Sequence, residues 1–204
     1  MAAPLAIAHT HVHSLRVSTG TCAGAEALVA RVLAADGTAG FGCTLNDDAG
    51  VARDMAAWDA LGKSRQVPLF KLLGGSYRTT VAVTKDDLPA LRPDWTELRK
   101  SILEGRYELL RIDPFAWGSV EMVQTIAASA AAFELGVALL APNAHPWEIQ
   151  YCAALAATLK GDDCRVILRK DFPEREIRIK EDPGIGIDWT VEPSFQSIKW
   201  QDPR

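Results

Sequence analysis

Several features that mark specialised proteins are missing from this chain of 204 residues. Its 22 lysines and arginines are scattered and are outnumbered by 26 acidic residues, so the chain offers no basic field to nucleic acid or anionic lipid. No apolar run approaches the ~20 residues that a transmembrane helix needs, and the first residues lack the pattern of an export signal. We therefore expect a cytoplasmic protein whose partners include neither nucleic acid nor a membrane.

Cysteine is also sparse. Cys22, Cys43, Cys152 and Cys164 form no Cys-x-x-Cys pair and no framework spacing, which favours reduced thiols in packed positions over disulfides. What the chain does contain is 48% hydrophobic and 24% charged residues. This composition is ordinary for one or two domains with a sizeable core.

The glycine pair Gly74-Gly75 separates two regions of different pattern. Residues 1–73 begin with alternating strand patterns and a hairpin signal at Asp36-Gly37, and continue into an amphipathic helix in AGVARDMAAWDALGK. Residues 74–204 alternate strand and helix patterns, which predicts βαβ units on a parallel sheet. The strand candidates in this second region are TTVAV, ELLRID, VALLA and RVILR.

Separated motifs in the chain resemble those of one family. The run DMAAWDALGKSRQVPLFKLLGG resembles the segment that joins the capping domain to the barrel in the mandelate racemase and muconate lactonizing branch of the enolase superfamily. The later run ELLRIDPFAWGSVEMVQTIAASAAAFELGVALLAPNAH resembles the sixth and seventh strand–helix units of that family's barrel, and EDPGIGID resembles its C-terminal close. The motifs occur in the order that the family has.

The resemblance implies an α/β fold with two parts. Residues 1–73 would form a shortened capping domain, a β-meander plus a helix, and residues 74–204 a partial β/α barrel with a C-terminal return segment. A complete barrel takes about 250 residues, so roughly half of it is expected to be missing. The run VAVTKDDLPALRPDW begins like the first barrel strand and continues like the segment after the fifth. Because a half-barrel exposes strand edges and an apolar inner face, we expect a homo-oligomer or a cover formed by the C-terminal segment.

The resemblance also implies a chemistry. Relatives remove the proton α to a carboxylate, and Mg²⁺ usually absorbs the charge that develops on the carboxylate oxygens, because a side chain alone is too weak a base. The chain would then be related to Mg²⁺-dependent dehydratases or racemases of sugar acids or other 2-hydroxy acids, with a carboxylate-bearing small molecule as its partner. Since the barrel strands that carry most metal ligands in relatives have no counterpart here, a non-catalytic or oligomer-forming relative is the alternative.

Two candidate catalytic residues follow predicted strands. By the resemblance, Asp113 matches the aspartate after the sixth barrel strand and His145 the histidine after the seventh, where the histidine is the base and the aspartate orients it. Without the resemblance, Asp113 before Pro114 is an ordinary turn acid, and His145 beside Pro146 caps the following helix.

The strand candidate near residue 81 ends in charged residues. By the resemblance, Asp86 stands near the place of the glutamate ligand of the fifth barrel strand, which makes it the candidate metal ligand, and Lys85 is a candidate substrate-binding residue. The alternative is that Lys85, Asp86 and Asp87 simply end a strand and begin a turn.

Arg111 is the second candidate for binding an acid substrate, because it lies near the end of an apolar strand. The alternative is a salt bridge from Arg111 to Glu108 or Asp113 within the same segment.

His9, His11 and His13 would share one face of a strand, since they are two residues apart. Imidazole suits Zn²⁺ and Ni²⁺, so this face is a candidate metal site. The alternative is a solvent-facing or partly covered strand face, because adjacent side chains of one strand rarely complete a tetrahedron.

Overall fold

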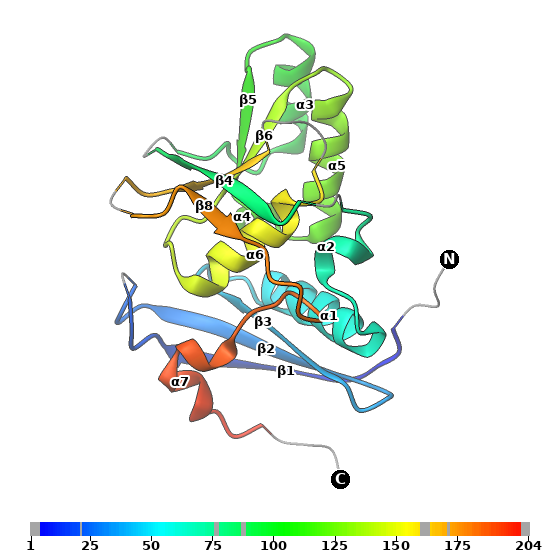
Figure 1. Ribbon diagram of the computed structural model, residues 1–204, viewed down its shortest axis with the longest axis vertical. Helices are drawn as coiled ribbons and strands as arrows, with labels where there is room; N and C mark the ends of the chain where they lie inside the picture. Colours follow the sequence, from blue (N-terminus) through cyan, green and yellow to red (C-terminus); the bar gives the residue numbers. More distant parts are fainter. Residues whose placement is uncertain are drawn as a thin grey trace.

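The computed structural model of this protein describes residues 5–20, 22–75, 78–86, 89–159, 164–170 and 172–200, so Asp87 lies outside the described residues. Two sheets, one antiparallel and one mostly parallel, are connected and covered by helices (Figure 1). The fold is α/β, with a small α+β capping region followed by a partial β/α barrel, as the sequence predicts. Within the described ranges, no helix has the length and apolar character to cross a membrane.

The capping sheet consists of three antiparallel strands, β1 (Ile7–Arg16), β2 (Glu26–Ala34) and β3 (Ala39–Thr44). The predicted hairpin joins β2 to β3. There Gly37 has a φ of 85°, which glycine adopts without steric cost, and the Asp36 side chain accepts a hydrogen bond from a backbone amide two residues later.

Helix α1 (Ala49–Arg65) covers one face of the capping sheet and packs its alanines against Ala30 and Val32 of β2. Gly40 and Gly42 of β3 make this close contact possible. A Cβ at these positions would lie 2.2 and 2.1 Å from backbone oxygen atoms of α1. The missing side chains on β3 therefore let the helix and the sheet approach each other.

The second sheet has the strand order β5-β6-β7-β4-β8. Its strands are β4 (Thr80–Lys85), β5 (Leu109–Ile112), β6 (Gly136–Leu140), β7 (Arg165–Leu168) and β8 (Glu176–Arg178). The first four are parallel, and β4, the first along the chain, pairs with β7, the last. The first and last strands of a closed β/α barrel are neighbours in the same way, so these four strands form part of a barrel. Strand β8 pairs antiparallel with β4 and covers its edge.

Helices pack around the parallel sheet. They are α2 (Leu69–Leu72), α3 (Trp95–Leu103), α4 (Pro114–Trp117), α5 (Val120–Ala131) and α6 (Pro146–Ala156). The side chains of Asp94 and Ser119 accept hydrogen bonds from first-turn amides of α3 and α5, as expected of N-caps. The main core lies where helices meet the sheet, and its members include Leu110, Ile112, Ile126, Leu139 and Val166.

The C-terminal segment returns to the capping sheet and covers its other face (Figure 1). It contains a single 3₁₀ turn, η1 (Trp189–Val191), and a short helix, α7 (Pro193–Gln196). The ring centroid of Trp189 lies 5.9 Å from that of Phe41 on β3 and 5.3 Å from that of Trp147 on α6. The capping sheet is thus packed between α1 and the C-terminal segment, and a domain boundary after residue 73 stays a prediction.

Candidate functional site

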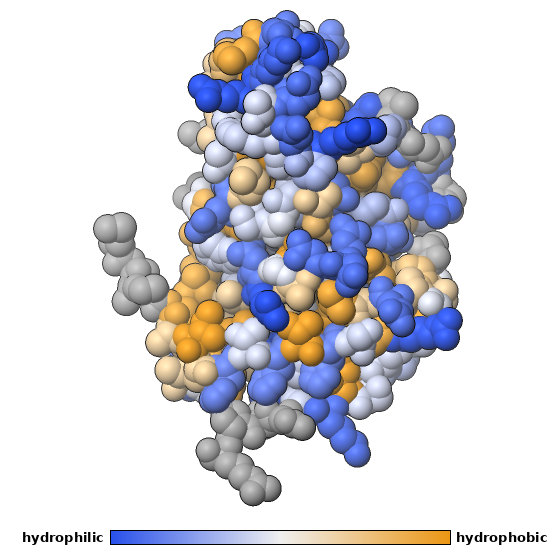
Figure 2. Space-filling model, turned by 180° about the vertical axis from the view of Figure 1, so that it is seen from behind, coloured by the Kyte–Doolittle hydropathy of each residue, from blue (hydrophilic) through white to orange (hydrophobic). Residues whose placement is uncertain are grey.

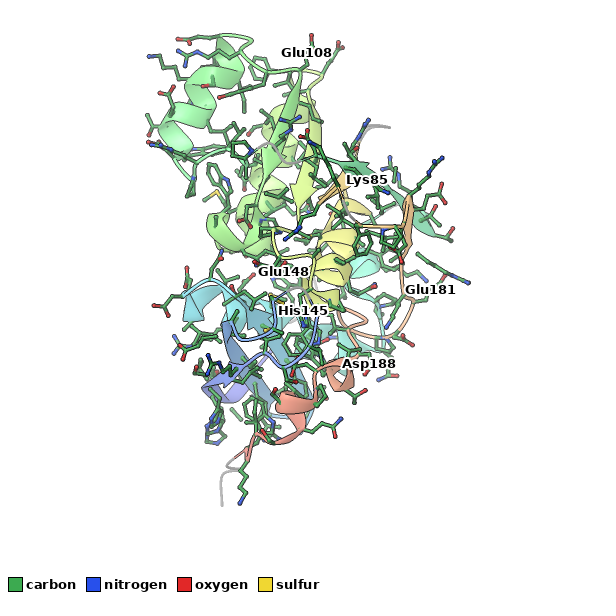
Figure 3. The ribbon with its side chains drawn as sticks, turned by 90° about the vertical axis from the view of Figure 1, so that its left-hand side faces the viewer. Lys85, Glu108, His145, Glu148, Glu181 and Asp188 are labelled. Carbon is green, nitrogen blue, oxygen red and sulfur yellow. The ribbon has the colours of Figure 1, made fainter. Side chains whose placement is uncertain are left out.

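The carboxyl ends of β5 and β6 point toward the capping sheet (Figure 1 and Figure 3). Figure 3 shows Glu108, which precedes β5, at the end of the molecule far from the capping sheet, and His145 and Glu148, which follow β6, near the boundary between the two sheets. Lys85, the last residue of β4, lies between these two levels in the same view. Sites in parallel β/α folds are built from residues that follow the strands, so the candidate site lies at this boundary.

Asp113 follows β5 and is the N-cap of α4. Its Oδ1 atom accepts hydrogen bonds from the backbone amides of Phe115, at 2.9 Å, and Ala116, at 3.3 Å. Burial raises the pKa of the Asp113 carboxyl group, while the two amide donors act in the opposite direction. The carboxylate thus caps a short helix that the sequence analysis does not predict.

His145 follows β6 and is the N-cap of α6. It is 2% exposed, and its Nδ1 atom accepts a hydrogen bond from the Trp147 amide at 3.3 Å. Burial lowers the pKa of His145, against the opposing effect of the Glu192 carboxylate. His145 is therefore neutral at pH 7, and because Nδ1 accepts, the ring proton is on Nε2.

The structure places Asp113 and His145 after neighbouring strands. Their side-chain hydrogen bonds run to backbone amides of the helices that they cap, and among the described residues none joins the two side chains. The predicted base and orienting pair therefore stays a prediction. Helix capping, the alternative given for His145, accounts for its contacts, and Asp113 caps a helix where an ordinary turn is the alternative.

Glu148, in the first turn of α6, is a buried acid at this site that the sequence analysis does not single out. It is 3% exposed, and both of its oxygens accept hydrogen bonds from Asn143: Oε2 from the backbone amide at 2.9 Å and Oε1 from the side-chain amide at 2.7 Å. Burial raises the pKa of Glu148 to about 7, Asn143 opposes this shift, and the charge of Asp113 adds to it. The available signal is its position three residues after the N-cap His145, where an acid commonly reaches back over a helix start.

Thiols surround this acid. The charge of Glu148 contributes to the raised pKa values of Cys152 on α6, Cys43 on β3 and Cys22 in the loop before β2, and burial is the larger cause in each case. Cys43, Cys152 and Cys164 are buried, in the packed positions that the sequence predicts, and Cys22 is partly buried. The boundary between the sheets therefore combines two acids, a neutral histidine and neutral thiols.

Asp86 and Arg111 form an ion pair at the ends of β4 and β5. The Asp86 Oδ2 and Arg111 Nη2 atoms are 2.6 Å apart, and the side chains are 20% and 27% exposed. The expectation that Arg111 pairs with Glu108 or Asp113 is wrong, because a residue from another strand supplies the partner. The candidate metal ligand and one candidate substrate-binding residue are thus bound to each other.

The other candidates make different contacts. Lys85 is exposed, and its Nζ atom is 3.5 Å from the carbonyl oxygen of Pro173. The rings of His9 and His11 stack with centroids 6.4 Å apart, whereas His13 makes an edge contact with Trp200 of the C-terminal segment. Across the part of the chain that the structure describes, no group of three or more His, Cys, Asp or Glu residues could hold a metal ion.

Comparison with known proteins gives no match to a family model or to a curated protein, but many to solved structures. A dipeptide epimerase from Enterococcus faecalis has a TM-score of 0.71 at 12% identity, and the alignment covers 89% of this chain and 99% of the epimerase. An N-succinyl Arg/Lys racemase from Bacillus cereus has a TM-score of 0.69 at 13% identity, with 96% and 98% covered. A mandelate racemase/muconate lactonizing enzyme from a marine actinobacterium gives 0.68 at 12% identity, with 92% and 99% covered.

The fold is that of the mandelate racemase/muconate lactonizing branch of the enolase superfamily. This confirms the resemblance that the motifs indicate, at the level of the fold. The alignments run over nearly all of these neighbours' chains, so the expected shortening relative to them stays a prediction. At such low identity the enolase-superfamily fold alone is established, and the activity has to be argued from the residues.

Proposed function

We propose that this protein binds a small carboxylate-bearing molecule at the strand ends and transfers the proton α to its carboxylate. The supporting observation is the grouping of the half-buried Asp113 with the buried His145 and Glu148, three titratable side chains with displaced pKa values, on an enolase-superfamily fold. Such displacements concentrate at functional sites, because acids and bases are tuned there by burial and by neighbouring charges. The racemase and epimerase among the neighbours support an isomerase reaction, with a lyase of the dehydratase type as the related possibility.

His145 is the proposed base in this reaction. Its neutral ring can take the proton when the substrate's α C–H bond breaks, and the electron pair of that bond passes toward the carboxylate oxygens. Because Nδ1 is occupied by the Trp147 amide, the ring must release this contact before that nitrogen can act. Asp113 is the proposed orienting acid.

Arg111 and Lys85 are the proposed groups for the substrate carboxylate. A guanidinium binds a carboxylate through two parallel hydrogen bonds, and both cations would stabilise charge that develops on its oxygens. Since Asp86 already occupies Arg111, a substrate has to displace an internal carboxylate in order to bind.

Magnesium accompanies solved neighbours that include an enolase from Pseudomonas fluorescens, a dipeptide epimerase from Enterococcus faecalis and a marine actinobacterial enzyme. Among the described residues, the donors do not fit such a site. Mg²⁺ needs near-octahedral oxygen ligands, whereas the candidate ligand Asp86 is held by a guanidinium at 2.6 Å. The proton transfer is therefore assigned to the protein's side chains alone.

Proton NMR in D₂O tests the proposal with a panel of sugar acids and other 2-hydroxy acids. The wild-type protein should replace the α proton of at least one acid by deuterium, and His145→Asn should slow this exchange by about 100-fold or more. His13→Asn, far from the strand ends, is the matched control and should leave the rate unchanged. No exchange with any acid, with or without added Mg²⁺, would contradict the proposal.

A non-catalytic relative is the second candidate function. The observation in its favour is that the candidate groups already have internal partners: Asp86 holds Arg111, and Asp113 and His145 accept backbone amides. Calorimetry separates the two functions, because a ligand that binds without α-proton exchange supports the second.

Homo-oligomer formation belongs to this second candidate. Figure 2 shows hydrophobic residues gathered over the lower half of one face, at the level of the capping sheet and α1. Light scattering after size exclusion should give a mass of at least twice 22.1 kDa, and a monomer at high concentration would contradict this part.

A further inference from the structure

The loop between β6 and α6, residues 141–145, ends at the candidate base. It turns through Ala144, which has a φ of 50°, a left-handed conformation that is unfavourable for any residue with a Cβ. A backbone hydrogen bond from the Ala144 amide to the Ala141 carbonyl, 3.1 Å, closes the turn. A strained residue of this kind persists only where surrounding contacts hold the backbone in place.

Glu148 supplies such a contact from the first turn of α6. Its two oxygens bind the backbone and side-chain amides of Asn143, at the centre of the loop. The residue between loop and helix is His145, whose carbonyl also accepts the Ile149 amide. Through Asn143, the Glu148 carboxylate thus fixes the approach of the chain to His145.

The groups that face Glu148 leave its charge poorly compensated. They are Asp113 at the end of β5, Cys152 on its own helix, Cys22 and Cys43 from the capping region, and the adjacent neutral His145. The thiols are neutral at pH 7, since burial raises their pKa values. Burial and the Asp113 charge bring the pKa of Glu148 to about 7, so both of its protonation states are populated near neutral pH.

We propose that Glu148 is a positioning residue for His145, and that it holds the 141–145 loop fully only when its carboxyl group is ionised. An ionised carboxylate accepts at both oxygens, which matches the two N–H donors of Asn143. A protonated acid carries an O–H group on one of its oxygens. Because this O–H group then faces an N–H donor of Asn143, the hydrogen bond from that donor is lost. The role in positioning a base rests on the proposed function, whereas the proton-dependent hold on the loop does not.

A pH titration of the wild-type protein by NMR tests the hold directly. The backbone and side-chain amide resonances of Asn143 should move together with a midpoint near 7, and a His145 ring resonance should follow the same midpoint. Amide hydrogen exchange at Asn143, corrected for its intrinsic pH dependence, should be about tenfold faster below the midpoint than above it.

Glu148→Gln mimics the protonated acid, because its side chain also presents one acceptor and one donor. This variant should remove the titration at Asn143 and give fast exchange at every pH. Glu121→Gln is the matched control, since Glu121 is also a first-turn glutamate, on α5, but is exposed. The control should titrate at Asn143 as the wild type does.

Two results would overturn the proposal: Asn143 amides that do not move from about pH 5 to 9, or an equal titration in Glu148→Gln. If Glu148→Gln fails to fold, the titration of the wild-type protein still tests the proposal. Titration at Asn143 without α-proton exchange on any acid would refute the proposed function and leave the hold on the loop standing.

Discussion

Two buried acids show how differently two regions of this molecule treat a carboxylate. Asp59 on α1 is fully buried, and it accepts hydrogen bonds from the backbone amides of Phe41 and Ile185 and pairs with the Lys63 ammonium group at 2.6 Å. Glu148 on α6 is almost as deeply buried, but its hydrogen-bond donors are neutral groups, the two amides of Asn143 and the backbone of His145, and no cation pairs with it among the described residues.

The difference distinguishes an acid that holds segments of the fold together from an acid that can change its protonation state. Asp59 joins β3, α1 and the C-terminal return segment, and a cation compensates its buried charge, as a permanent ion pair requires. Glu148 has the like charge of Asp113 nearby and takes up a proton near neutral pH, because its pKa is about 7. An acid that can change its charge at neutral pH is suited to proton chemistry rather than to holding segments together.

Asp59→Ala should give the largest effect on stability. It leaves two buried amides and the Lys63 ammonium group without their acceptor, which typically costs about 3 to 5 kcal/mol. Urea unfolding followed by circular dichroism measures the change, and the exposed Asp47→Ala is the control, with an effect of about 0.5 kcal/mol or less. If Asp59→Ala lowered the free energy of unfolding as little as the control does, the Asp59 carboxylate would not be what holds β3, α1 and the C-terminal segment together.

Glu192→Gln tests a second structural acid, which binds the C-terminal segment to the end of β1. Glu192 is fully buried and accepts hydrogen bonds from both the amides and the hydroxyls of Ser18, Thr19 and Ser194. Burial alone would raise the pKa of Glu192, but the hydrogen bonds from Ser18 and Ser194 outweigh it and lower the pKa to about 2. Because this is below the unfolded value of about 4.3, the contribution is complete above that value and is lost as the pH falls toward 2.

The variant should therefore be less stable than the wild type by about 2 to 3 kcal/mol at pH 6, and the difference should shrink as the pH falls from about 4 to 2. Chemical unfolding at several pH values measures it, with the exposed Glu176→Gln as the control. A difference independent of pH would show that the carboxylate charge is not what binds the segment.

The sequence predicts most of the elements because their signals are local. The four parallel strands and the hairpin at Asp36-Gly37 depend on patterns within a few residues. The family resemblance adds the order of the capping region and the barrel strands along the chain. Short α4 is missed because Asp113-Pro114 resembles an ordinary turn until the first helical hydrogen bonds are present.

Contacts between distant segments could not be predicted in the same way, because no local pattern in the sequence marks them. Ser18 and Glu192 are 174 positions apart, and the burial of Glu148 depends on how the capping sheet lies against α6. The Asp86–Arg111 pair spans strands that have β6 and β7 between them in the sheet, so it depends on the curvature of the sheet.

Breaking that ion pair should have the smallest effect on stability and the clearest effect on binding. Both side chains are partly exposed, so Asp86→Asn should lower the free energy of unfolding by about 1 kcal/mol or less. The same change releases Arg111 from a competing carboxylate, and the affinity for a small carboxylate ligand in calorimetry should therefore rise. Glu97→Gln, on α3, weakens a more exposed pair with Arg106, which follows the helix, and should leave ligand affinity unchanged. A large loss of stability in Asp86→Asn, with no gain in affinity, would place this pair with Asp59 among the structural contacts and remove Arg111 from the candidate site.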